Sequence, residues 1–140
     1  MPTISATVTN SQGQHAVSLT TNDRNHTLAI APGASGFGSS ANGGELLFLA
    51  LATCYCNDIY REAARQQITV RCVEVTVDGE FDAAPGSAAR NVRYSARVEA
   101  EASEAEIEAL MRHTDTVAEI HNTLRQGATV TLASVEAVTV

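Results

Sequence analysis

The chain has 140 residues with a hydrophobic content of 44%, which suffices for a single core, so we expect one domain over residues 1–140. Its formal net charge is −7, and all nine basic residues are arginine. Only Arg24 precedes Arg61, so the sequence lacks the clustered basic face that binds DNA or RNA. Neither a signal-type apolar run nor an uncharged segment of bilayer length occurs, so we expect a cytoplasmic protein without membrane contact.

The N-terminal third has the pattern of a small antiparallel β-meander. Residues 3–8 and 15–19 alternate, are rich in β-branched side chains, and flank a turn-forming stretch that contains Gly13. A third run covers residues 26–30. Strands this short are too thin to bury a core alone, so we expect the meander to pack on another part of the molecule.

Residues 32–44 contain five glycines and three serines, which is typical of an irregular loop. No phosphate cradle is expected at residues 33–38, because the P-loop lysine and the strand-to-helix spacing of dinucleotide sites are both missing. We therefore expect no cofactor. The glycines let the backbone approach a neighbouring segment closely.

A central helix is expected over residues 43–66. Residues 46–52 are all apolar, a run too continuous for an amphipathic surface helix and too short to cross a membrane, which suits a helix buried on most of its circumference. The sequence then turns polar, so the helix should leave the core near Asp58 and Arg61. Cys54 lies at this transition and shares its helical face with both residues.

The second half of the chain predicts a hairpin, a helix and a last strand. Two alternating segments, residues 68–81 and 91–101, predict a long β-hairpin with a polar outer face. Ser103 and Glu106 form a capping box that opens a second helix, which Gly127 ends. Alternating apolar residues over 128–140 predict one or two C-terminal strands. The predicted fold class is therefore α+β.

The three cysteines, an odd number, do not suggest a secreted disulfide framework. Cys72, in a predicted strand, is most simply a small buried hydrophobic residue. Cys54 is a candidate reactive thiol, because exposure and a nearby arginine favour a thiolate, although an inert buried cysteine is the alternative. Cys56 points about 200° away from Cys54 around the helix, so these two cannot form a disulfide within an intact helix.

His113 and His121 share one face of the second predicted helix. They lie two turns apart, roughly 12 Å along the axis, which is too far for them to share a metal ion without further ligands. We therefore expect no metal site and interpret these histidines as surface or hydrogen-bonded residues.

A family resemblance centres on the helix that carries the candidate thiol. The segment that ends there reads Glu45-Leu46-Leu47-Phe48-Leu49-Ala50-Leu51-Ala52-Thr53-Cys54. It resembles the motif Pro-x-Glu-Leu-Leu-x-x-Ala-Leu-Ala-x-Cys of the OsmC/Ohr family, and the order of elements is similar over nearly the whole chain. The resemblance implies an intertwined homodimer in which the central helices of two chains pack back to back between β-sheets.

In active members of that family a helix cysteine attacks an organic hydroperoxide, a second cysteine resolves the resulting sulfenic acid, and an arginine and a glutamate assist. By position Cys54 matches the peroxidatic cysteine. Ala118 stands where the resolving cysteine would be, and Gly44 stands where the glutamate would be. The assisting arginine has two candidates, Arg24 in the N-terminal third and Arg61 two turns after the cysteine.

Two functions stay open from the sequence, and a generic structural dimer is a third alternative. The first is a thiol peroxidase of the oxidative-stress class with Cys54, Arg24 and Arg61 as catalytic residues. Cys56, Cys72 or an external small thiol or dithiol would then take the place of the resolving cysteine. The second is a non-catalytic member of the same family that binds a small apolar ligand beside the central helices.

Overall fold

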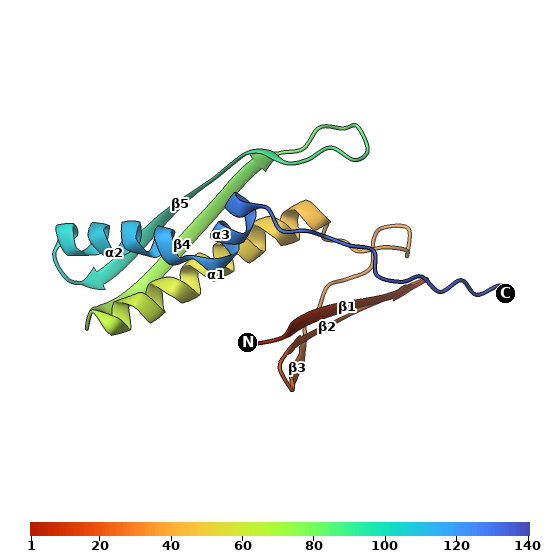
Figure 1. The fold of residues 1–140 in the computed structure, drawn as a ribbon, viewed down its shortest axis with the longest axis horizontal. Helices are drawn as coiled ribbons and strands as arrows, with labels where there is room; N and C mark the ends of the chain where they lie inside the picture. The colour runs from red at the N-terminus through yellow and green to blue at the C-terminus, as the bar shows by residue number, and fades with distance from the viewer. The chain divides into compact units, whose positions relative to one another are not determined.

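Eight helices and strands follow one another in the computed structural model, which describes residues 1–140. They are β1 (Ile4–Ser11), β2 (Gln14–Thr21), β3 (Arg24–Thr27), α1 (Gly43–Arg65), β4 (Thr69–Glu80), β5 (Arg90–Glu101), α2 (Glu104–Val117) and α3 (Glu119–Gln126) (Figure 1). The chain divides into two compact units, residues 1–47 and 48–140. Helices occur together with antiparallel sheets, which confirms the predicted α+β class. None of the helices combines the length and hydrophobicity that crossing a membrane needs.

The first unit contains the predicted antiparallel meander, with strand order β1-β2-β3. Gly13 makes the turn between β1 and β2 with a φ of 74°, a conformation that glycine adopts without strain. The glycine-rich loop is attached to this hairpin, because the Asn10 side chain and the Gly38 backbone exchange hydrogen bonds of 2.9 and 3.0 Å. The third strand is Arg24–Thr27 and lies earlier than the predicted residues 26–30.

Asn42 and Glu45 form a reciprocal cap at the start of α1. The Asn42 side chain accepts a hydrogen bond from the Glu45 backbone N–H at 2.8 Å, and the Glu45 carboxylate accepts one from the Asn42 N–H at 2.9 Å. This cap explains why the helix begins at the end of the glycine-rich loop.

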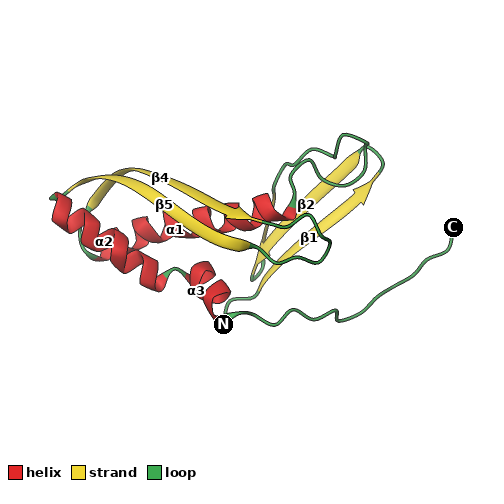
Figure 2. Ribbon diagram, turned by 90° about the horizontal axis from the view of Figure 1, so that it is seen from above, coloured by secondary structure: helices red, strands yellow, loops and turns green.

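The second unit is built on the predicted long hairpin of β4 and β5, in which Val73 lies opposite Val98. Alternate side chains of both strands point to one face, where they pack against the core residues of α1 and α2. In Figure 2 these two helices run along the hairpin. The buried core consists of Tyr55, Ile59, Ala63 and Leu110. The other face of the hairpin carries exposed polar and charged side chains, so the predicted polar outer face is confirmed.

The burial of α1 differs from the prediction. Of residues 46–52 only Leu51 is buried in the chain, and Leu49 is 52% exposed. The C-terminal half, for which the polar sequence predicts exposure, holds buried residues instead, and Asp58 and Glu62 are only 6% and 3% exposed. That prediction is wrong because carboxylates can be buried when they are ion-paired: Arg61 on the same helix pairs with both, and His113 on α2 binds Glu62.

The second predicted helix is interrupted at Ala118 and forms α2 and α3. Ala118 has an extended backbone (φ −69°, ψ 112°), and the Asn122 side chain donates a hydrogen bond to the Thr116 carbonyl across the break. The prediction of one continuous helix is wrong because the apolar periodicity continues through this break. The capping box is confirmed, since the Ser103 hydroxyl accepts a hydrogen bond from the Glu106 N–H at 3.2 Å.

Residues 128–140 form neither helix nor strand, although their alternating pattern predicts a strand, and all of them are exposed. A strand needs a neighbouring edge for its backbone N–H and C=O groups. The two sheets of the chain pair their strands without this segment, so the predicted strand is not formed within one chain.

Leu110→Ala tests the core of the second unit. Leu110 is completely buried, so losing its side chain should lower the free energy of unfolding by about 2–5 kcal/mol. Leu124→Ala is the matched control, because Leu124 is 45% exposed and its truncation should cost about 1 kcal/mol or less. Urea unfolding at one fixed protein concentration measures both losses, and equal losses would contradict the core described here.

Candidate functional site

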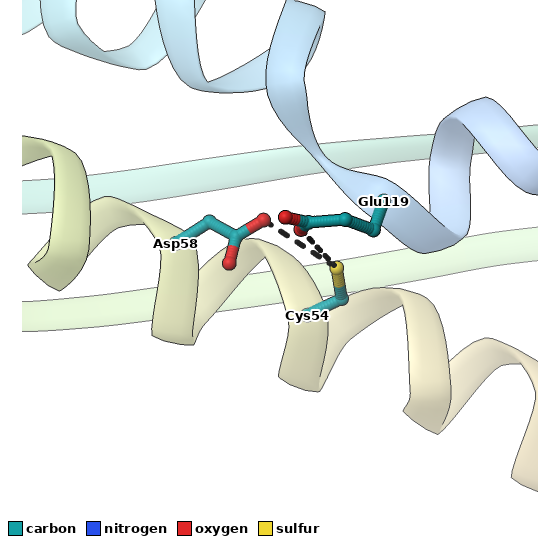
Figure 3. Close-up of side chains that lie close together, drawn as sticks. All are labelled: Cys54, Asp58 and Glu119. Carbon is teal, nitrogen blue, oxygen red and sulfur yellow. Dashed lines mark hydrogen bonds between the residues drawn. The ribbon is translucent and has the colours of Figure 1, made fainter. Parts of the chain in front are cut away.

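A thiol and two carboxylates come together in the second unit (Figure 3). The Cys54 Sγ lies 3.6 Å from Asp58 Oδ2 and 3.9 Å from Glu119 Oε1. One side-chain polar atom of each residue lies within 4.8 Å of the others. Cys54 is half-buried, Asp58 is buried and Glu119 is exposed, so the cluster has a solvent-accessible side next to Glu119.

Secondary structure positions these three side chains. Cys54 and Asp58 are four residues apart on α1, so they lie one turn apart on the same face. The helix break at Ala118 starts α3 beside this face, and Glu119 is its first residue. The backbone of the next residue, Ile120, acts to lower the pKa of the Cys54 thiol.

Arg61 lies on α1 three residues beyond Asp58 and binds carboxylates. Its Nη1 is 3.1 Å from Asp58 Oδ1 and 2.8 Å from Glu119 Oε2, and its Nε is 2.8 Å from Glu62 Oε2. The other oxygen of Glu62 is 2.7 Å from His113 Nε2 on α2. One guanidinium therefore connects α1 to α3 directly and to α2 through Glu62.

The surroundings of Cys54 favour the neutral thiol. Burial raises the pKa of Cys54, the Ile120 backbone N–H partly offsets this rise, and the negative charges of Asp58 and Glu119 raise the pKa again. Arg61 forms its ion pairs with the carboxylates. At neutral pH the resting group is therefore an S–H that donates a hydrogen bond.

The two carboxyl groups have different acidities. Burial, followed by the hydrogen bond and charge of Glu119, raises the pKa of Asp58 to about 6, against the opposing effect of Arg61. The hydrogen bond with Asp58 and the ion pair with Arg61 lower the pKa of Glu119. Below about pH 6 one proton is therefore bound to the pair, and it is bound to Asp58 rather than to Glu119.

The structure brings together some of the predicted site residues. Arg61 forms ion pairs with Asp58 and Glu119, the two carboxylates next to Cys54. Arg24, in contrast, lies in β3 of the first unit. Cys56 lines a cavity of about 240 Å³ between α1 and β4, and Cys72 is exposed on β4. The other two thiols thus lie outside the cluster around Cys54.

Nothing in the sequence pattern by itself pointed to Glu119, which stands 65 residues along the chain from the cysteine. Its neighbour Ala118, at the position matched to a resolving cysteine, is completely buried and brings no reactive group. An acidic residue in the first turn of a helix was the only available signal, and it becomes informative only once the helix break is known.

The carboxylates of the cluster already have a cationic partner within the protein. Thiolate and carboxylate groups are also donors that zinc accepts. Here, however, the Arg61 guanidinium binds one oxygen of Asp58 and one of Glu119, and we assign no metal to this cluster.

The interpretation of His121 as a surface or hydrogen-bonded residue is wrong, because the side chain is buried without a hydrogen-bond partner. It is 4% exposed, its ring centroid lies 4.7 Å from that of Tyr94 and 6.1 Å from that of Tyr55, and neither ring nitrogen has a hydrogen-bond partner. Burial lowers the pKa of His121, which keeps it neutral. Tyr55 and Tyr94 also line a cavity of about 460 Å³ together with Met111.

Comparison with known proteins finds a matching family and similar folds. A family model described as OsmC-like protein matches residues 36–133, and no curated protein matches the chain. Among solved structures, the OsmC-like protein from Mycoplasma pneumoniae is 22% identical with a TM-score of 0.62, and the match covers 89% of this chain and 87% of that chain. An organic hydroperoxide resistance protein from Elizabethkingia anophelis is 17% identical, with a TM-score of 0.57 and 88% of both chains covered. A similar protein from Legionella pneumophila is 22% identical, with a TM-score of 0.51 and coverages of 88% and 89%.

Arg61→Met should lower the free energy of unfolding by about 1–3 kcal/mol at pH 8, because it leaves the buried carboxylates of Asp58 and Glu62 without their shared cation. The loss should be smaller at pH 5, since Asp58, with a pKa of about 6, is then protonated and needs no counter-ion. Denaturant unfolding at both pH values measures the difference.

Arg65→Met is the matched control on the same helix. Its guanidinium is 73% exposed and 3.8 Å from Glu62, so its removal should change the free energy of unfolding by about 0.5 kcal/mol or less. A loss from Arg61→Met that is no larger than the control, or that does not change with pH, would contradict the described network.

Proposed function

Because the chain belongs to the OsmC-like family, we propose that it acts in oxidative-stress defence and reduces organic hydroperoxides through the thiol of Cys54. The observation that carries this proposal is the setting of Cys54, a half-buried thiol on the central helix with a carboxylate oxygen 3.6 Å from its sulfur. Two of the similar structures are named as hydroperoxide resistance proteins. A partly accessible thiol beside ionisable groups can meet a peroxide and exchange a proton during attack.

The proposed reaction oxidises the sulfur and reduces the peroxide. The sulfur attacks the terminal oxygen of ROOH, so that an S–O bond forms, the O–O bond breaks, and the products are a sulfenic acid and the alcohol ROH. A small thiol then reacts with the sulfenic acid to give a mixed disulfide and water. A second small thiol exchanges with this disulfide, which restores Cys54 and releases the oxidised reductant.

An external thiol or dithiol is the proposed reductant because the chain offers no second sulfur in the cluster. Ala118 replaces the resolving cysteine, Cys56 lines a separate cavity, and Cys72 lies exposed on β4. We place the reaction in the cytoplasm, where small thiols are abundant and keep protein cysteines reduced.

Arg61 is proposed to act on the thiol indirectly. By binding Asp58 and Glu119 it limits the repulsion between their charges and the negative charge that develops on the sulfur during attack. Arg24 lies in the first unit, and its predicted role beside Cys54 stays a prediction.

We also propose that two chains form an intertwined homodimer and complete a single domain fold. All residues of β1 are exposed, including Ile4 at 75% and Val8 at 60%. Leu49 on α1 and the apolar residues within 128–140 are also exposed. Exposed apolar surface of this extent is typical of an association site. A second chain would supply a strand edge for residues 128–140 and a helix surface against Leu49.

Binding of a small apolar ligand is the second candidate function, and the cavity beside Tyr55, Tyr94 and Met111 favours it. Its volume of about 460 Å³ suits a small molecule, and its lining joins Tyr55, Tyr94, Ala96 and Met111 to a charged rim of Glu108, Arg112 and Asp115. This function requires no reaction at Cys54, so the reactivity of that thiol separates the two candidates.

Cys54→Ser tests the peroxidase proposal. The reduced natural chain, mixed with cumene hydroperoxide, should gain one oxygen by intact mass and lose it when a small thiol is added, whereas the variant should oxidise at least about 10-fold more slowly. Cys56→Ser, two residues away on the same helix, is the control and should keep the natural rate. Oxidation of the natural chain no faster than that of free cysteine would contradict the proposal and favour ligand binding.

Leu49→Glu tests the proposed dimer. A carboxylate placed in an apolar helix interface is costly to bury, so the variant should sediment as a monomer at concentrations where the natural chain is a dimer. Arg112→Glu is the control for added negative charge, because the Arg112 side chain is 79% exposed on α2, and it should stay dimeric. A natural chain that sediments as a monomer at micromolar concentration would exclude this assembly.

A further inference from the structure

The two oxygens of Asp58 have different neighbours. Oδ1 is 3.1 Å from Arg61 Nη1, whereas Oδ2 is 3.6 Å from the Cys54 sulfur. A neutral thiol is the donor in such a contact and an ionised carboxylate is only an acceptor, so the Cys54 S–H points its proton at Asp58. Asp58 is 6% exposed, and its contact with the thiol lies largely away from bulk water.

We propose that Asp58 is the catalytic base of this site, which takes the proton of Cys54 as the sulfur attacks and returns it to the leaving group. This inference rests on the proposed function in one respect: the natural electrophile that the sulfur attacks is taken to be an organic hydroperoxide. A general base has to lie within hydrogen-bond reach of the proton that it moves, and Asp58 is the buried carboxylate that meets this condition at Cys54.

The charged groups around Asp58 come from three helices. From α3, Glu119 directs Oε1 at the sulfur, at 3.9 Å, and Oε2 at Arg61, at 2.8 Å. From α1, Arg61 binds both carboxylates, and Glu62 binds the guanidinium through Nε. From α2, His113 Nε2 lies 2.7 Å from Glu62 Oε1, the oxygen that Arg61 does not bind. The hairpin contributes apolar side chains to the core beneath α1.

Asp58 suits the role of base better than Glu119 does. Its sulfur contact is the shorter of the two, and it is buried, whereas the Glu119 side chain is 60% exposed. Burial also raises the pKa of Asp58 to about 6, whereas the hydrogen bond with Asp58 lowers the pKa of Glu119. A base is most effective when its pKa lies near the working pH, so Asp58 is both ionised and a useful acceptor at neutral pH.

The attack of Cys54 on the hydroperoxide balances in protons and electrons when Asp58 carries the proton. The S–H proton moves to Asp58 Oδ2 while the sulfur bonds to the terminal oxygen of ROOH and the O–O bond breaks. The sulfur loses two electrons and becomes a sulfenic acid, whose hydrogen is the one that the peroxide carried. The alkoxide RO⁻ takes the proton from Asp58 and leaves as ROH, so Asp58 ends the step as the carboxylate that began it.

The test measures the rate constant of Cys54 with two electrophiles from pH 5 to pH 9, in full chains that carry Cys56→Ser and Cys72→Ser so that one thiol reacts. Iodoacetamide is the first probe, because an S–C bond replaces C–I, iodide leaves and the thiol proton goes to the base without any peroxide. Cumene hydroperoxide is the second. The chain with Asp58 should show a rate that rises with the ionisation of Asp58 near pH 6, below the range of the thiol itself.

Asp58→Asn should abolish this rise and react at least about 10-fold more slowly with both probes at pH 7. Removing the negative charge favours the thiolate, so a variant that reacts equally fast or faster at pH 7 would overturn the proposal. Glu119→Gln is the matched control: it should keep the rise and move it to lower pH, because Glu119 raises the pKa of Asp58. Loss of the rise in Glu119→Gln alone would assign the base to Glu119 instead.

Two further outcomes keep the inferences separate. If Asp58→Asn does not fold, the chain that keeps Asp58 still tests the proposal. A rate constant of Cys54 that does not rise between pH 5 and pH 7 in that chain overturns it. If alkylation depends on Asp58 but hydroperoxide reacts no faster than with free cysteine, the assignment of Asp58 stands and the proposed peroxidase function fails.

Discussion

The ion pairs of Arg61 are the interaction on which the second unit depends. The C-terminal half of α1 buries Asp58 and Glu62, and two ionised carboxylates inside a protein are stable only with a positive partner. Arg61 supplies that partner to both and reaches Glu119 on α3 as well. The same guanidinium therefore permits the burial of α1 and sets the position of α3 against it.

This arrangement also decides the chemistry available to Cys54. A reactive cysteine commonly has a cation beside the sulfur, which lowers the pKa of the thiol. Here the carboxylates stand between the sulfur and Arg61, and burial together with their charge raises that pKa. Reactivity at neutral pH then depends on moving the proton during attack rather than on a preformed thiolate, and a buried carboxylate with a pKa of about 6 is suited to this task.

The core of one chain is small for its length. Only six hydrophobic residues are buried, and the most apolar part of α1 contributes Leu51 alone. The first unit has a sheet whose first strand is exposed at every residue. Hydrophobic burial provides most of the favourable free energy of folding, and large exposed apolar surfaces are typical of association sites. The proposed dimer accounts for these surfaces and for the alternating pattern of residues 128–140.

The amino-acid sequence by itself determined the α+β class, the meander, the central helix, the long hairpin and the capped helix, because alternation, helical spacing and capping residues are local patterns. It also pointed to Cys54 as the candidate reactive thiol, since the motif around it is a continuous segment. Only the tertiary structure decided that α2 and α3 are separated at Ala118, that Glu119 approaches the thiol, and that the polar end of α1 is buried. Glu119 reaches Arg61, and Glu62 reaches His113, across long separations in the chain. The energy of such pairs is set by burial and distance in space, which no local pattern records.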